Sequence, residues 1–361
     1  MSSEPTAPGP VVGVVVEALG VPVGIPVTGE AATRLRHQWS RALTDRPAAR
    51  SIDVSPDEVH DEAAFDYSVT TRVTLAALEA TAGQRLNLHA GAVAAEDGRA
   101  LALVGPSGSG KTTAIALLAT RLGYLSDETV SLDEGLGVHP HPKPLSVVVD
   151  GAVPMAKGSV SPDDLGLGRA PESAYLHRLV LLHRGDDDAG LVPLPPARAI
   201  VEVVEQSSSL VHLDQPVRTL ADAIDACGGA WALHYREFAD HLDEVLGLLD
   251  GAAQPPAARL HHPSDGGDAG RVDGPVAGAW SRTPWTDAME YDDELVVMVG
   301  DRVQVLGGLG VVLWLELAQP RTEAELVSAV TAAWGEHPQS AALVAEALGV
   351  LSGQGLVRPP A

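Results

Sequence analysis

The residues from Gly105 to Thr113 have the types and the spacing of a phosphate-binding loop. Their sequence, GPSGSGKTT, fits the pattern GxxxxGK[ST] at every fixed position. The apolar run 100–104 suits a buried parallel strand before the loop, and 112–121 reads as the helix after it. Backbone N–H groups of such a loop and helix start bind phosphate. The stretch therefore predicts a nucleotide site, against the alternative of a glycine-rich turn that binds nothing.

Nucleotide contacts are expected from the glycines, serines, lysine and threonines of the loop. These residues are Gly105, Ser107, Gly108, Ser109, Gly110, Lys111, Thr112 and Thr113. Lys111 is expected to reach the β- and γ-phosphates, and the hydroxyl of Thr112 is expected to bind Mg²⁺. ATP and Mg²⁺ are the predicted cofactors.

An acidic pair, Asp127 and Glu128, lies in the next predicted strand, 123–130. Asp127 comes 16 positions after Lys111, the length of one helix plus one strand. In a doubly wound sheet, the two strands end at the same crevice. Both carboxylates are therefore expected to reach the magnesium and the γ-phosphate.

The order of these motifs resembles the catalytic domain of HPr kinase/phosphorylase and its kinase relatives. The resemblance is carried by His89, Gly91, Val93, the phosphate loop, Asp127 and Glu128. The segment PHPKPL, 140–145, also resembles kinase-like proteins found in clusters that make ribosomal peptides. The family's later arginine- and proline-rich signature has no counterpart here, so the phosphorylase reaction and the substrate HPr are not carried over.

The resemblance implies a role for each matching residue. Lys111 and Thr112 would bind phosphate and metal. Asp127 matches the general base on the acceptor hydroxyl, and Glu128 replaces the family's second aspartate at the metal. His89 matches the histidine beside the phosphates. A transporter ATPase is rejected for the same loop, because the acidic pair follows Lys111 far too soon.

The bulk composition excludes several classes of partner. The chain has 361 residues, 45% of them hydrophobic, and a formal net charge of −24. Such acidity argues against non-specific binding to nucleic acid or to an anionic membrane. A single cysteine, Cys227, allows no internal disulfide. Because the start has no basic region and no apolar run reaches the length of a membrane span, a cytoplasmic protein is expected.

The chain divides into four predicted segments: a disordered tail (1–10), an HPr-kinase-like nucleotide-binding domain (11–250), a Gly/Pro/Asp-rich linker (251–287) and a small C-terminal domain (288–361). The resemblance to HPr kinase implies that 11–250 is an α/β P-loop domain of the HPr kinase and PEP carboxykinase type. A small α+β winged-helix domain is expected after it. Residues 11–85 carry no chemical motif, and no role is assigned to them.

The C-terminal domain is predicted as a hairpin, 295–306, followed by three helices, the second with Thr322 as N-cap and Glu325 completing a capping box. This pattern resembles the PqqD family, the winged-helix element that recognises leader peptides of ribosomally made, modified peptides (RiPPs). Residues from 291 onward carry nine acidic residues and three arginines, which disfavours DNA binding. Peptide capture at the hairpin edge is expected; a domain that only packs or dimerises is the alternative.

Together these features predict a protein of RiPP biosynthesis. It would bind the leader of a precursor peptide through 288–361 and phosphorylate a serine or threonine of that peptide with ATP. The alternative is a non-catalytic recognition protein that presents the precursor to separate biosynthetic enzymes. Neither reading involves nucleic acid or a membrane.

Overall fold

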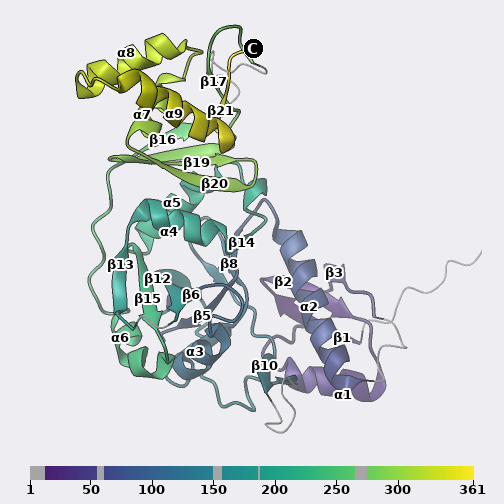
Figure 1. Cartoon of the computed structure of the whole chain (residues 1–361). Helices are drawn as coiled ribbons and strands as arrows, with labels where there is room; N and C mark the ends of the chain where they lie inside the picture. Colours follow the sequence, from purple (N-terminus) through teal and green to yellow (C-terminus); the bar gives the residue numbers. More distant parts are fainter. Residues whose placement is uncertain (1–12, 55–60, 149–156, 186–187, 265–274) are drawn as a thin grey trace, which may run out of the picture. The chain divides into compact units, whose positions relative to one another are not determined.

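The computed structural model describes residues 13–54, 61–148, 157–185, 188–264 and 275–361 (Figure 1). The predicted tail, 1–10, lies outside these residues. The chain forms two compact units: the first comprises 1–193 with 206–209 and 230–253, and the second comprises 194–205, 210–229 and 254–361. None of the helices in the described ranges is long and apolar enough to cross a membrane.

A six-stranded mixed sheet organises the first unit. Its strand order is β13-β15-β12-β6-β5-β7. The strands are β5 (Ala90–Ala94), β6 (Arg99–Val104), β7 (Gly123–Ser126), β12 (Tyr175–Arg184), β13 (Gly190–Leu194) and β15 (Ala230–Tyr235). The predicted strand before the phosphate loop is confirmed as β6, and the loop leads into α3 (Lys111–Leu118).

The direction of β5 decides what meets at one edge of this sheet. β6 is parallel to β12, but β5 runs antiparallel to both β6 and β7. β6 and β7 therefore end at the same edge, where the antiparallel β5 begins. The phosphate loop, the acidic pair and His89 follow or precede these strands directly. The sheet is mixed because β5 is antiparallel to its neighbours, and β6 and β7 still end at one edge, as the doubly wound sheet in the sequence prediction requires.

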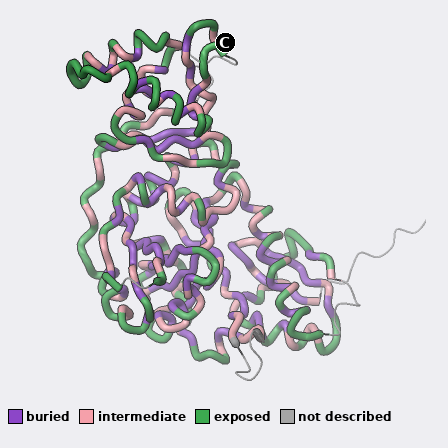
Figure 2. The backbone as a smooth tube through the Cα atoms, in the orientation of Figure 1, coloured by how far each residue is buried: buried purple, intermediate pink, exposed green. Residues whose placement is uncertain are grey.

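Apolar side chains on this sheet are buried against α3 and α6 (Leu242–Gly247). Leu101, Leu103, Ile115 and Val180 belong to one cluster with almost no exposed surface, and Figure 2 shows many buried segments in the interior of this unit. Near-complete burial on both faces explains why β6 reads as an uninterrupted apolar run. This packed layer gives the phosphate loop a rigid base.

Residues 13–54 and 61–81 form a second layer of the first unit, with a hydrophobic core of its own. β1 (Val14–Ala18) pairs with β2 (Val21–Ile25), and β3 (Arg50–Ser51) adds to β2. α1 (Gly29–Gln38) and α2 (Glu62–Thr81) complete this layer. Trp39, Phe65, Val69 and Val73 are buried in its core. One face of α2 remains available to a site elsewhere in the unit.

Two smaller sheets complete the first unit. One has the order β14-β4-β8-β9, and the other pairs β10 with β11. Their strands are β4 (Leu86–Leu88), β8 (Val130–Leu132), β9 (Val138–His139), β10 (Leu145–Val148), β11 (Lys157–Val160) and β14 (Ser207–Ser208). His89 lies between β4 and β5, and Asp127 and Glu128 lie between β7 and β8. The expected continuous strands 86–94 and 123–130 are therefore each broken at the site.

The second unit is built on the sheet β16-β18-β19-β20. Its strands are β16 (Arg259–Pro263), β18 (Asp287–Tyr291), β19 (Glu294–Val299) and β20 (Arg302–Gly307), with the small pair β17 (Ser281–Arg282) and β21 (Val357–Arg358). Its helices are α4 (Pro196–Val204), α5 (Pro216–Ala226), α7 (Leu309–Glu316), α8 (Glu323–Trp334) and α9 (Ser340–Gly353). The predicted hairpin and three helices are confirmed, including the capping box of Thr322 and Glu325.

The predicted domain boundaries need two corrections. The expected linker, 251–287, contains β16, which pairs with β18 along five residues. In addition, α4 and α5, which were expected in the domain 11–250, belong to the second compact unit and contact β18, β19 and β20. The physical reason is amphipathicity: the buried stripe of α4, which includes Ile200 and Val203, needs an apolar sheet face to cover it.

The segment 140–144, PHPKP, is held by backbone hydrogen bonds in the first unit. Leu19 N–H donates to the carbonyl of Pro140 at 3.1 Å, and His141 N–H donates to the carbonyl of Leu125 at 3.0 Å. Alternating prolines restrict the backbone further. The segment therefore has a fixed path alongside the end of β7.

His141 anchors this segment in a neutral state. Its Nε2 lies 2.9 Å from the Thr74 hydroxyl, and its ring packs against Trp39 at 5.9 Å. Because the Thr74 hydroxyl donates to the Thr70 carbonyl, the assigned role of Nε2–H is to donate to Thr74. Complete burial, reinforced by the charge of Lys143, lowers the pKa of His141 to about 3.

His141 makes stability depend on pH below neutrality. Its folded pKa lies below the unfolded value, so its contribution is present above pH 6.5 and is lost as pH falls toward 3. We expect this residue to remove about 2 kcal/mol of unfolding free energy between pH 7 and pH 5. Urea unfolding at both pH values should show this loss in the wild type and in an exposed-histidine control, His212→Gln. The loss should shrink by that amount in His141→Gln; an unchanged loss would contradict the assignment.

Candidate functional site

The phosphate loop has the backbone that its glycines allow. Gly108 and Gly110 have φ of 85° and 88°, in the left-handed region that favours glycine. Gly110 is the N-cap of α3. The first N–H groups of a helix have no partner within the helix, so those of Lys111, Thr112 and Thr113 are available to an anion. The positive end of the helix dipole adds to this preference.

Lys111 lies over its own loop. Its Nζ donates to the carbonyls of Gly105 at 2.5 Å and Pro106 at 3.0 Å. Burial lowers the pKa of Lys111, while the charges of Glu128 and Asp127 oppose that shift. Carbonyl oxygens are weaker partners for an ammonium than phosphate oxygens are. The lysine is therefore placed to exchange these carbonyls for a phosphate.

Asp127 links the loop to the sheet and to a third segment. Its Oδ2 accepts a hydrogen bond from Thr112 Oγ1 at 3.1 Å, and its Oδ1 accepts one from the Tyr124 hydroxyl at 3.0 Å. Oδ1 also lies 3.0 Å from Lys143 Nζ. A carboxylate offers about four lone pairs, and these three contacts leave one of them, on Oδ2. That oxygen is the one beside the phosphate loop.

Lys143 is the buried partner of both acidic residues. Its Nζ lies 3.0 Å from Asp127 Oδ1 and 3.2 Å from Glu128 Oε2, and the Pro144 carbonyl is 3.4 Å away. The side chains of Lys143 and Asp127 are 4% and 3% exposed, whereas that of Glu128 is 47% exposed. Burial alone would lower the pKa of Lys143, but the two carboxylates outweigh it and raise the pKa above its usual value.

His89 belongs to the same site without touching the acidic pair. Its backbone N–H donates to the Gln206 carbonyl at 2.6 Å, and Nδ1 lies 3.4 Å from Gln206 Oε1. Burial, followed by the charge of Lys111, lowers the pKa of His89. The histidine is therefore neutral at pH 7 and suited to hydrogen bonding.

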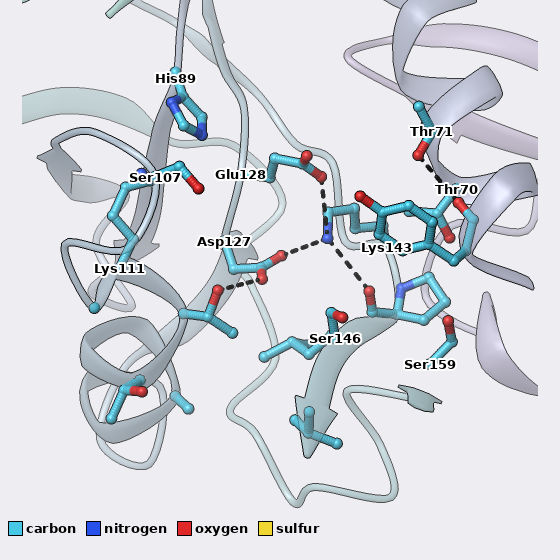
Figure 3. A pocket seen from close by; sticks show the side chains of 18 of the residues that line it. Thr70, Thr71, His89, Ser107, Lys111, Asp127, Glu128, Lys143, Ser146 and Ser159 are labelled. Atoms are coloured by element: carbon cyan, nitrogen blue, oxygen red, sulfur yellow. Dashed lines mark hydrogen bonds and ion pairs between the residues drawn. The ribbon is translucent and has the colours of Figure 1, made fainter. Parts of the chain in front are cut away.

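These groups surround one cavity of about 630 Å³ in the first unit. Phosphate-loop residues line one wall, while Thr70 and Thr71 of α2 lie on the opposite side with Lys143 between them (Figure 3). The predicted site residues that line it are His89, Ser107, Gly108, Gly110, Lys111, Thr112, Thr113, Asp127 and Glu128. Gly105 and Ser109 do not line it: their carbonyls accept hydrogen bonds from Lys111 and Tyr235.

The donor set fits a nucleotide with Mg²⁺. A threonine hydroxyl and two carboxylates are hard oxygen ligands, and Mg²⁺ in nucleotide sites uses one or two carboxylates plus the phosphates. In the described ranges, no group of three or more His, Cys, Asp or Glu side chains could hold a metal ion by itself. The predicted metal ligands Thr112 and Glu128 have no contact with each other; Asp127 contacts Thr112, and Glu128 contacts Lys143.

Sequence reasoning missed Lys143 and the α2 wall as parts of the site. A signal for the lysine was present: the chain has 21 arginines but three lysines, Lys111, Lys143 and Lys157. Because lysine carries a compact ammonium and arginine a planar fork, the rare lysines are positions to compare with Lys111. No comparable signal marked α2, because its site-facing hydroxyls lie on an ordinary helix.

No family model and no curated protein matches this chain.

Unequal burial makes the two acidic residues differ in their effect on stability. Asp127→Asn leaves the buried Lys143 without its closest counter-charge, so we expect a loss of about 3–5 kcal/mol. Glu128→Gln alters a half-exposed pair and should cost less than about 1 kcal/mol. Urea unfolding of the full chain at pH 7, followed by circular dichroism, measures the free energy of unfolding of both variants. Equal losses would contradict the larger contribution that we assign to the buried pair of Asp127 and Lys143.

Proposed function

We propose that the chain is an ATP-dependent kinase-like enzyme that phosphorylates a serine or threonine of a peptide, in the RiPP setting that the sequence resembles. The observation that carries this proposal is the convergence of Lys111, Thr112 and Asp127 on one cavity. A phosphate cradle next to a carboxylate with a free lone pair is the minimum equipment for phosphoryl transfer to a hydroxyl.

In this proposal the side chains divide the work of one displacement. The acceptor oxygen forms a bond to the γ-phosphorus while the bond from phosphorus to the β,γ-bridging oxygen breaks, and that electron pair leaves with ADP. The acceptor proton passes to Oδ2 of Asp127. Lys111 holds the β- and γ-phosphates and offsets the charge that develops on them. His89, neutral, donates a hydrogen bond to the phosphates.

Thr112 is the proposed side chain nearest the metal, and Glu128, the other predicted metal ligand, is paired with Lys143. Magnesium, when bound with the nucleotide, would screen the phosphate charge and orient the transferred group. The Thr112 hydroxyl oxygen can face a cation while its O–H still donates to Asp127 Oδ2, because a hydroxyl is both a donor and an acceptor. The Thr112–Asp127 hydrogen bond is therefore compatible with a loaded site.

The acceptor would enter from the side opposite the phosphate loop. Thr70 and Thr71 of α2 and Ser146 and Ser159 of β10 and β11 line that side of the cavity. The Thr70 and Thr71 hydroxyls donate to helix carbonyls, so they are left to accept hydrogen bonds from the N–H groups of a peptide. This gives the N-terminal layer, which has no motif, a part in substrate binding.

The second unit is proposed to hold the leader region of the peptide. β20 is an edge strand of its sheet, which leaves one side of its backbone open to another strand. Val305 on β20, and Leu343 and Val350 on α9, are exposed apolar side chains. Because residues from 291 onward are acidic overall, a basic leader is favoured. Two sites on one chain raise the effective concentration of the acceptor.

A non-catalytic recognition protein is the second candidate. The observation that favours it is that three of the four lone pairs of the Asp127 carboxylate are already engaged. A carboxylate held in this way is a constrained base. In that case the nucleotide would stabilise the first unit, and separate enzymes would modify the peptide.

Intact mass of a peptide incubated with the full chain, ATP and Mg²⁺ separates the two candidates. The probes are short peptides encoded next to the gene. A kinase should add one phosphate, and Lys111→Ala should reduce the rate by about 10²-fold or more, because a phosphate contact in the transition state is lost.

Leader binding, measured by fluorescence anisotropy, is the control for folding and should be equal in both proteins. Leader binding without any mass gain would leave recognition as the function. Phosphorylation that persists in Lys111→Ala would place the chemistry outside this cavity.

A further inference from the structure

The position of Lys143 raises a question that its role as an ion-pair partner does not answer. It is one of three lysines in the chain, and it lines the cavity although its side chain is 4% exposed. Its ammonium sits between the carboxylates of Asp127 and Glu128, which are oxygen ligands of the kind that Mg²⁺ takes (Figure 3). The singly charged ammonium of Lys143 thus occupies a position between two carboxylates that would also suit a divalent cation.

The backbone around Lys143 is fixed. Lys143 N–H donates to the His141 carbonyl at 2.8 Å, and its own carbonyl accepts from the Tyr124 hydroxyl at 3.3 Å. Prolines at 142 and 144 flank it, and the residue before Pro142, His141, is buried. The main chain of Lys143 is therefore held in place, and its buried side chain is held by the two carboxylates.

The two oxygens of Asp127 face different partners. Oδ2 faces Thr112 of the phosphate loop, and Oδ1 faces Lys143. A cation bound beside Thr112 therefore need not displace Lys143. A second cation between Asp127 and Glu128 would have to displace it, and would meet a buried ammonium at contact distance.

We propose that Lys143 is a built-in cation of the phosphoryl-transfer site, which takes the place of a second divalent ion so that the nucleotide binds with one. Protein kinases use two Mg²⁺ ions for this charge. Here Lys111 and Lys143 balance Asp127 and Glu128, so the four side chains sum to zero. Without Lys143 the sum is −1, which repels a nucleotide and attracts a further divalent ion.

This inference rests on the proposed function, and its test counts ions rather than product. The full chain is titrated with Mn²⁺ in the presence of saturating AMP-PNP, and bound Mn²⁺ is counted by electron paramagnetic resonance. A parallel titration without nucleotide is subtracted, because an acidic surface binds Mn²⁺ weakly. Lys143→Met removes the ammonium, and Lys143→Gln keeps a hydrogen-bonding group without charge in case the first variant fails to fold. Arg121→Met is the matched control, since it removes one positive charge from an exposed pair with Asp243.

The wild type and Arg121→Met should bind one Mn²⁺ per nucleotide complex, and the Lys143 variants two. In EDTA the Lys143 variants should bind AMP-PNP roughly tenfold more weakly than Arg121→Met does. Two ions in the wild type, or one in folded Lys143 variants, would overturn the inference and leave nucleotide binding intact. No AMP-PNP binding by the wild type would overturn the proposed function and the inference with it.

Discussion

The site depends on the hydrogen bonds and the ion pair that the buried carboxylate of Asp127 forms. It joins the helix after the phosphate loop through Thr112, the end of β7 through Tyr124 and the segment 140–144 through Lys143. A buried charge of this kind is stable only with its partners in place. The requirement therefore fixes the three segments relative to one another and gives the cavity one geometry before any ligand binds.

The order and direction of the strands explain why the site can be formed by a few residues that directly precede or follow strands. β5 lies antiparallel between β6 and β7. The start of β5 therefore lies at the same edge of the sheet as the ends of β6 and β7. His89, the phosphate loop and Asp127 are thus neighbours without long loops. The N-terminal layer then closes the cavity with α2, so residues without any motif contribute a wall of hydroxyl groups.

Local signals predicted the parts of the site that depend on local rules. The phosphate loop could be predicted because its glycines and Lys111 have a fixed spacing. The capping box at Thr322 could be predicted because it spans one helical turn. The linker prediction failed at β16, since a strand rich in histidine and proline lacks apolar alternation and is ordered by pairing with β18. Lys143 was missed for a similar reason: its partner Asp127 lies 16 residues away, and only the fold brings the two charges together.

The central claim is that this cavity binds a nucleotide through the phosphate loop. Isothermal titration of the full chain with ATP in the presence of Mg²⁺ tests it most directly, with Lys111→Ala as the comparison and circular dichroism to show that both proteins are folded. We predict one nucleotide per chain in the wild type and an affinity at least roughly tenfold lower in the variant. No binding by the folded wild type, or equal binding by both proteins, would contradict the account.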